Sequence, residues 1–233
     1  PVITTPFQVT PSDWTNGDVT ITASASDSGG SGINADGFEY SLDGMHNWQN
    51  GRSVTVSANG IVYFRVKDNA GNVSTYQSCT VTNIDTTPPF INITPNTLEW
   101  RNDSVTLIAA GTDSGGSGID DETYEYKIGT GGRWIPGSTA IVESNRTVWF
   151  RVKDKVGNLS PEFSHTVENI DKTFPVITSI SQSPSGFTNG SVTVTAAAQD
   201  NGDGSGIEQD SWQHRVGTGS WTAGASATVW SNC

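Results

Sequence analysis

Apolar and polar residues alternate along most of this chain with a period of two. Residues 18–25 (DVTITASA) carry an apolar side chain at every second position, and residues 38–42 and 54–56 repeat the alternation. Such a pattern is typical of β-strands that bury one face. Residues 61–66 add a run of β-branched and aromatic residues, which strands favour. Because no stretch of useful length has the helical period, the pattern predicts an all-β chain.

The signals between these runs are those of turns. Asn59 and Gly60 separate two predicted strands, and both residue types tolerate the positive φ that tight hairpins require. We therefore expect a hairpin there. Short strands with turn signals about every 8–12 residues are typical of a β-sandwich.

The same pattern returns along the chain at a fixed offset. Residues 64–74 (FRVKDNAGNVS) recur as 150–160 (FRVKDKVGNLS), and residues 83–89 (NIDTTPP) recur as 169–175 (NIDKTFP), so that 150 − 64 and 169 − 83 both equal 86. A period of this length suits one compact sandwich domain and exceeds that of ordinary solenoid repeats. The chain is therefore expected to be a tandem array.

A glycine-rich loop is part of each repeat. It reads DSGGSGI at residues 27–33 and 113–119, and it returns with one inserted residue at 200–207. A phosphate-binding loop would need a lysine and a following helix, and both are missing here. We interpret the segment as a structural loop.

The offset predicts three units, residues 1–86, 87–172 and 173–233. Prolines in the connecting segments restrict the backbone, so the links are expected to be short and stiff. Aligning residues 135–145 with 222–232 predicts that the third unit lacks its last two strands and has open sheet edges. Two explanations stay open: an end cut within a longer protein, or a strand supplied by another chain, as in donor-strand polymers.

The order of these motifs, including YSLDG with a tryptophan and FRVKDNAGN, resembles the tandem immunoglobulin-like repeats of large secreted and surface-anchored bacterial proteins, such as adhesin stalks. It is also similar to the domain named for the leptospiral outer-membrane protein of the OmpL type. The resemblance covers the whole chain and implies immunoglobulin-like β-sandwiches in a linear array, with the last one incomplete. It further implies a structural stalk or spacer outside the cell or on a bacterial surface. The chain lacks the paired cysteines of antibody domains.

The charge balance narrows the range of partners. A formal net charge of −12 argues against nucleic acid, which is bound by neutralising phosphates with Lys and Arg. It also disfavours anionic membrane surfaces and attracts cations. No apolar run approaches the roughly 20 residues that span a bilayer, so we expect no membrane insertion of this segment.

The sequence contains no pattern typical of a catalytic site. His46, His165 and His214 occupy unrelated positions in the three units, and no Gly-x-Ser-x-Gly nucleophile motif occurs. Paired carboxylates for glycoside hydrolysis would need a cleft, which repeated sandwiches do not provide. We predict that the chain is not an enzyme.

Two sets of large aromatic residues recur, namely Trp14, Trp100 and Phe187, and Trp48, Trp134 and Trp221. Recurrence in every unit favours packing in the core, since each sandwich needs the same interior. The rival interpretation is a platform for stacking sugars, for which the unrepeated Trp149 and Trp230 are better candidates.

One constellation predicts a metal site. In an immunoglobulin-like sandwich, the loops after the second and sixth strands lie at the end where the first strand starts. Those loops hold Asp113 and Asp154 in the second unit, and the incoming linker carries Asp85. Calcium prefers such oxygen ligands. We predict a junction Ca²⁺ at these three residues, with Asp171 and Asp200 beginning the equivalent site before the third unit.

An alternative explains the same acidic residues without metal, because Asp before a Gly-rich turn shapes the loop by bonding its own backbone. Three functions stay open at this point. The chain is predicted to be a spacer whose partners are its neighbouring repeats, stiffened by calcium. The alternatives are a module that binds glycans or host proteins, and a subunit that assembles with other copies of itself into a filament by strand complementation.

Overall fold

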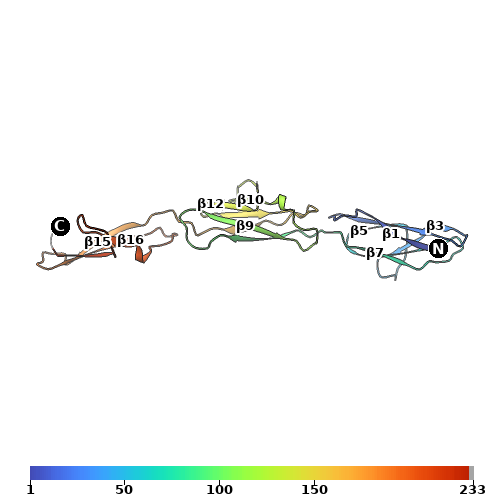
Figure 1. The fold of residues 1–233 in the computed structure, drawn as a ribbon, viewed down its shortest axis with the longest axis horizontal. Coiled ribbons are helices and arrows are strands. Elements are labelled where there is room, and N and C mark those ends of the chain that lie inside the picture. Colours follow the sequence, from blue (N-terminus) through green and yellow to red (C-terminus); the bar gives the residue numbers. More distant parts are fainter. Residues whose placement is uncertain (231–233) are drawn as a thin grey trace.

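The computed structural model describes residues 1–230. Their regular structure is β-strand apart from two 3₁₀ helices of three residues each. Three units follow one another along a single long axis, with the N- and C-terminal ends at opposite extremes (Figure 1). The all-β class predicted from the hydrophobic pattern is confirmed, and so is the linear array of sandwiches inferred from the repeats and the resemblance.

The first unit consists of seven strands. They are β1 (Val2–Thr10), β2 (Val19–Ser26), β3 (Ile33–Ser41), β4 (Gln49–Asn50), β5 (Ser53–Val56), β6 (Gly60–Asp68) and β7 (Gln77–Val81). They form two antiparallel sheets in the orders β1-β2-β5 and β4-β3-β6-β7. The sheets pack face to face as an immunoglobulin-like sandwich.

The second unit repeats this architecture strand for strand. Its strands are β8 (Phe90–Pro95), β9 (Val105–Thr112), β10 (Glu125–Ile128), β11 (Ile135–Pro136), β12 (Thr139–Val142), β13 (Thr147–Arg151) and β14 (Phe163–Thr166). The sheet orders are β12-β9-β8 and β11-β10-β13-β14. A short 3₁₀ helix, Asp121–Thr123, precedes β10.

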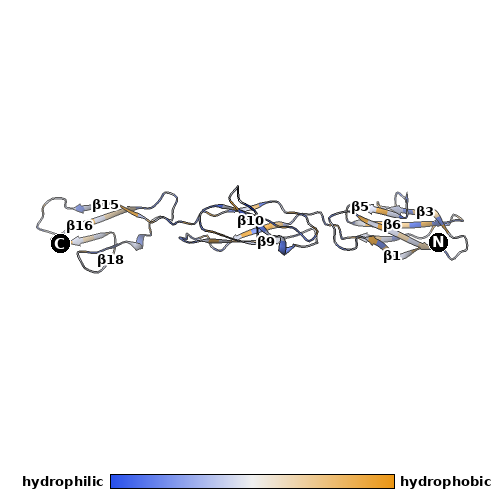
Figure 2. Ribbon diagram, turned by 90° about the horizontal axis from the view of Figure 1, so that it is seen from above, coloured by the Kyte–Doolittle hydropathy of each residue, from blue (hydrophilic) through white to orange (hydrophobic). Residues whose placement is uncertain are grey.

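Each of these two sandwiches closes its own apolar interior. In β2 the alternating residues Val19, Ile21 and Ala23 are fully buried, as the period of two predicts. Phe64 and Phe150 are the largest completely buried side chains of the two cores. The buried clusters are separate, one within residues 3–84 and the other within 91–170, so no core runs across the linker. Hydrophobic residues lie along the strands of each unit (Figure 2).

The third unit is an incomplete sandwich. Its strands are β15 (Val176–Ser183), β16 (Val192–Gln199), β17 (Gln213–His214), β18 (Thr222–Ala223) and β19 (Ser226–Val229), in the sheets β15-β16-β19 and β17-β18. Within residues 173–230, no strand takes the place that β6 and β7 hold in the first unit. No apolar side chain in this range is fully buried.

The predicted hairpin at Asn59 and Gly60 is wrong. Strand β5 pairs with β2 whereas β6 pairs with β3 and β7, so the chain crosses from one sheet to the other at this point. The Asn59 side chain instead binds the departing linker: Nδ2 donates to Ile84 O (2.7 Å) and Oδ1 accepts from Ile84 N (2.9 Å). An amide carries both a donor and an acceptor, which explains why asparagine serves here and again at Asn145.

Candidate metal centre at the first junction

The linker between the first two repeats is anchored to the first sandwich. Ile84 is buried in that core and forms a parallel bridge with Thr15. Thr15 N donates to Asn83 O (2.9 Å), and Asp85 N donates to Thr15 O (2.8 Å). The backbone of Asp85, where the chain leaves the first repeat, is therefore held in a fixed position.

The Asp85 side chain and carbonyl then reach the second sandwich. Ser117 N donates to Asp85 Oδ2 (3.0 Å), and Asn158 Nδ2 donates to Asp85 O (2.9 Å). Thr87 N donates to Oδ1 (3.0 Å). Only 1% of Asp85 is exposed. One residue thus belongs structurally to both repeats.

Asp113 and Asp154 are held by the loops that carry them. Asp113 accepts hydrogen bonds from Gly115 N (3.0 Å) and Gly118 N (2.7 Å). Asp154 accepts from the backbone (2.8 Å) and side-chain (2.7 Å) nitrogens of Asn158. The loop-shaping role considered for these residues is therefore present, and it fixes where their carboxylates point.

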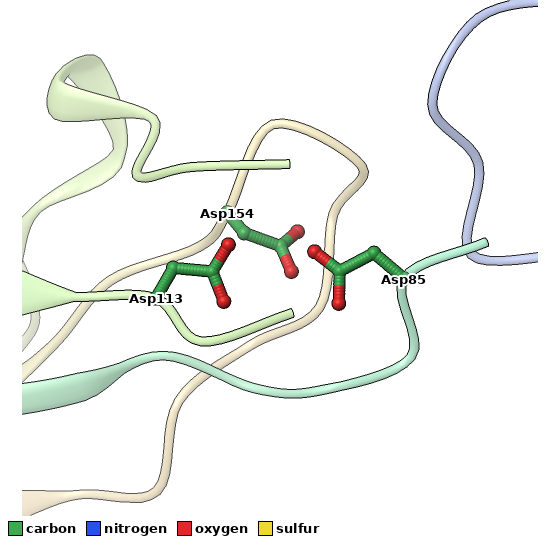
Figure 3. Close-up of side chains that lie close together, drawn as sticks. All are labelled: Asp85, Asp113 and Asp154. Atoms are coloured by element: carbon green, nitrogen blue, oxygen red, sulfur yellow. The ribbon is translucent and has the colours of Figure 1, made fainter. Parts of the chain in front are cut away.

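The structure brings these three carboxylates together. Asp85, Asp113 and Asp154 each offer an oxygen, and these oxygens lie within 4.8 Å of one another. Figure 3 shows the three groups pointing toward one another from the linker and from two loops. Carboxylates this close repel when all are ionised, so the arrangement favours either a shared proton or a bound cation.

Ser117 adds a fourth oxygen beside Asp85. Ser117 is 7% exposed, and its Oγ makes no hydrogen bond with any described residue. At the second junction the equivalent Ser205 hydroxyl does have a partner, because it bonds Asp171 Oδ2 (3.1 Å). A buried hydroxyl without a partner is costly, and a cation at the cluster would satisfy it.

The electrostatics of Asp85 favour a charged site. Burial disfavours ionisation of this carboxyl, but the hydrogen-bond donors around it, the N–H groups of Thr87 and Ser117 among them, outweigh the effect of burial. Together they hold the pKa of Asp85 below its usual value of 3.8. The Asp85 carboxyl is therefore ionised at neutral pH.

The second junction repeats two contacts of the first, because a serine N–H bonds the linker aspartate and a glycine N–H bonds the loop aspartate at both junctions. Asp171 accepts from Ser205 N (2.8 Å), and Asp200 accepts from Gly206 N (2.8 Å). With its amide nitrogen facing them, Asn201 donates to Asp200 (3.0 Å) and Asp171 (3.3 Å). Within residues 1–230 a group of three potential metal ligands forms only at the first junction. The site predicted at Asp171 and Asp200 stays a prediction.

The recurring tryptophans are not core residues, so that expectation is wrong. Trp14 and Trp100 are each 44% exposed. The Trp48 ring lies under Arg65 (4.1 Å to the ring centroid), and the Trp134 ring lies under Arg151 (4.0 Å). These residues recur because the sheet surfaces and the junctions repeat from unit to unit. Recurrence in the sequence does not tell such surface positions apart from positions in a repeated core.

The proposed sugar platform at Trp149 is partly covered. Lys127 Nζ lies 5.5 Å from the Trp149 ring centroid and 4.6 Å from that of Trp134, with Glu162 paired to the same ammonium (2.7 Å). The lysine therefore lies over one face of the Trp149 ring. Trp230 is 80% exposed.

In the described part of the chain, no helix is long and apolar enough to cross a membrane. The sequence predicts the three acidic residues of the cluster but not the unpartnered hydroxyl of Ser117. The equivalence of Ser31, Ser117 and Ser205 was a visible signal, although the burial of one hydroxyl was not.

No protein-family model matches the chain, and no curated protein matches it. Among solved structures, the fibronectin(III)-like modules of Clostridium thermocellum CbhA are 13% identical, covering 69% of this chain and 92% of that one at a TM-score of 0.30. The FN1–FN3 domains of chicken CNTN1 are 9% identical over 96% and 86% (TM-score 0.32). The Escherichia coli adhesin FdeC is 13% identical over 84% and 75% (TM-score 0.31). The sheet order of this chain itself, β1-β2-β5 against β4-β3-β6-β7, defines its fold.

Proposed function

We propose that this chain is a spacer segment of an extracellular bacterial surface protein, and that Ca²⁺ stiffens its first junction. The observation that carries the proposal is the convergence of Asp85, Asp113 and Asp154 beside the unpartnered hydroxyl of Ser117. The role is mechanical, and no catalytic step is assigned to the chain.

The donor set suits calcium. Ca²⁺ accepts about six to eight oxygen ligands in adaptable geometry, and extracellular modules bind it with dissociation constants of roughly 10⁻⁴–10⁻³ M. Three carboxylates and one hydroxyl supply four ligands, and water would complete the shell. The net charge of −12 raises the local cation concentration around the chain.

The consequence for the array follows from where each ligand is attached. Asp85 is bonded to the first sandwich through Thr15, whereas Asp113 and Asp154 belong to loops of the second. An ion shared by all three would remove their repulsion and restrict bending at the linker. A chain of such joints keeps a distant domain extended from a surface.

Small-angle X-ray scattering of the whole chain tests this proposal. Calcium is expected to give a longer maximum dimension and a narrower distribution of shapes than a chelator does. Magnesium at the same ionic strength controls for screening of the net charge. Identical scattering curves with calcium and with chelator would contradict the proposal.

A further inference from the structure

We propose that Trp14 of the first repeat is a positioning residue for the metal site of the second, so that docking of the two repeats and calcium affinity are coupled. The inference rests on the proposed function and deepens it. It assigns to the junction tryptophan a regulatory role at a site that it does not itself ligate.

The contact between Trp14 and the metal-binding loop is close. A Cβ placed on Gly116 would lie 2.6, 3.1 and 3.3 Å from three atoms of the Trp14 ring. The adjacent Gly115 faces the linker in the same way, since a Cβ there would overlap the Asp85 carboxylate. Two successive glycines therefore form a socket that receives one aromatic ring and one carboxylate from the first repeat.

The socket lies in the loop that supplies the ligands. Gly116 immediately precedes Ser117, and Asp113 closes the loop through bonds to Gly115 N and Gly118 N. Gly116 has φ of 108°, a conformation that glycine reaches without strain and leaves as easily. Asp113 holds this loop from within, and the Trp14 ring adds a contact from the first repeat.

Trp14 and Asp85 come from one rigid surface. Trp14 directly precedes Thr15, whose backbone bonds Asn83 and Asp85. The first repeat therefore presents the ring and the first carboxylate at a fixed separation. Seating the ring on Gly116 aligns Asp113 and Ser117 with Asp85, which lowers the cost of organising the site.

Thermodynamic linkage makes the effect reciprocal. If docking of Trp14 raises calcium affinity by some factor, calcium raises the docking equilibrium by the same factor. The ion then acts on the angle between repeats through the tryptophan as well as through its direct ligands.

Calcium titration of the full chain by isothermal calorimetry tests this inference, with Asp171→Asn present throughout to remove any binding at the second junction. We expect Trp14→Ala to weaken binding about tenfold, within the range typical of coupled sites. Trp14→Phe should also weaken binding, because the Trp14 atoms nearest to Gly116 are Cη2, Cζ2 and Cζ3 at the outer edge of the indole, and a phenylalanine ring is too short to place atoms there. Trp100→Ala is the matched control, since Trp100 is equally exposed at the other junction, and it should leave the affinity unchanged.

An unchanged affinity in Trp14→Ala overturns the inference while leaving the proposed function intact. Equal weakening by Trp100→Ala also overturns it, because the effect would then not be local. A parent chain that binds no calcium overturns both proposals. If Trp14→Ala unfolds the first repeat in chelator, Trp14→Leu carries the same expectation of weaker binding.

Discussion

Replacing Asp154 by asparagine separates the metal-binding role of this residue from its loop-shaping role. Asp68 is the equivalent residue of the first repeat and provides the control. Its oxygens accept from Asn72 N (2.8 Å) and Nδ2 (2.8 Å), just as those of Asp154 accept from Asn158. Both aspartates are buried, but only Asp154 belongs to a cluster of three carboxylates. The two substitutions therefore weaken the same pair of bonds to an asparagine, and Asp154→Asn changes the cluster as well.

Loss of the Asp154 charge should have opposite effects on the stability of the second repeat with and without calcium. At 4.8 Å, two like charges repel by roughly 1–3.5 kcal/mol for effective dielectric constants between about 80 and 20. In chelator, Asp154→Asn relieves this repulsion, whereas Asp68→Asn does not. The loss of unfolding free energy in the second repeat of Asp154→Asn should therefore be smaller, by at least about 1 kcal/mol, than the loss in the first repeat of Asp68→Asn. At about 10 mM calcium and a dissociation constant of roughly 10⁻⁴–10⁻³ M, binding stabilises the parent chain by about 1.4–2.7 kcal/mol.

Differential scanning calorimetry measures both effects. The parent chain and Asp68→Asn should melt roughly 5–20 °C higher in calcium than in chelator at the transition of the second repeat. Asp154→Asn should lose most of that shift. If calcium raises the melting temperature of Asp154→Asn as much as that of the parent chain, the cluster is not the binding site and the reasoning fails.

Further predictions concern the fold that supports the site. Phe150→Ala empties the centre of a closed core and should cost about 3–5 kcal/mol in urea unfolding, against no more than about 0.5 kcal/mol for a substitution at an exposed position. Asn59→Ala leaves two polar groups of Ile84 unpaired and should cost about 1–3 kcal/mol; a loss near zero would show that water replaces the amide. The pKa of Asp85 is lowered on folding, so its stabilising contribution is complete above its usual value of 3.8 and disappears as pH falls through the lower folded value. Melting temperatures between about pH 5 and 2 should therefore fall with pH, and Asp85→Asn should reduce that fall.

Much of the architecture could be predicted because strand geometry imposes a period of two. Val19, Ile21 and Ala23 alternate in the sequence and are buried together in one face of β2. The shared offset of 86 then carries the same sandwich from the first unit to the second. The convergence of Asp113 and Asp154 on the linker followed from topology, since both loops must lie at the same end of the sandwich.

Side-chain roles at the junction could not be predicted in the same way. A residue that recurs in every unit can lie in a repeated core or at a repeated junction. Recurrence alone therefore favours the interior for Trp14, although the structure places it at the junction. Asn59 and Gly60 are residue types typical of a hairpin turn. Only the sheet order shows that the chain instead crosses from one sheet to the other there. The free hydroxyl of Ser117 depends on which atoms surround it in three dimensions.

The most direct measurement of the central claim is the diffraction of crystals of this chain grown in calcium, with anomalous scattering used to locate the ion. The account predicts one Ca²⁺ bonded to Asp85, Asp113, Asp154 and Ser117 Oγ at about 2.3–2.6 Å. Crystals saturated with calcium in which these oxygens hold only water, or have turned away from one another, would contradict it.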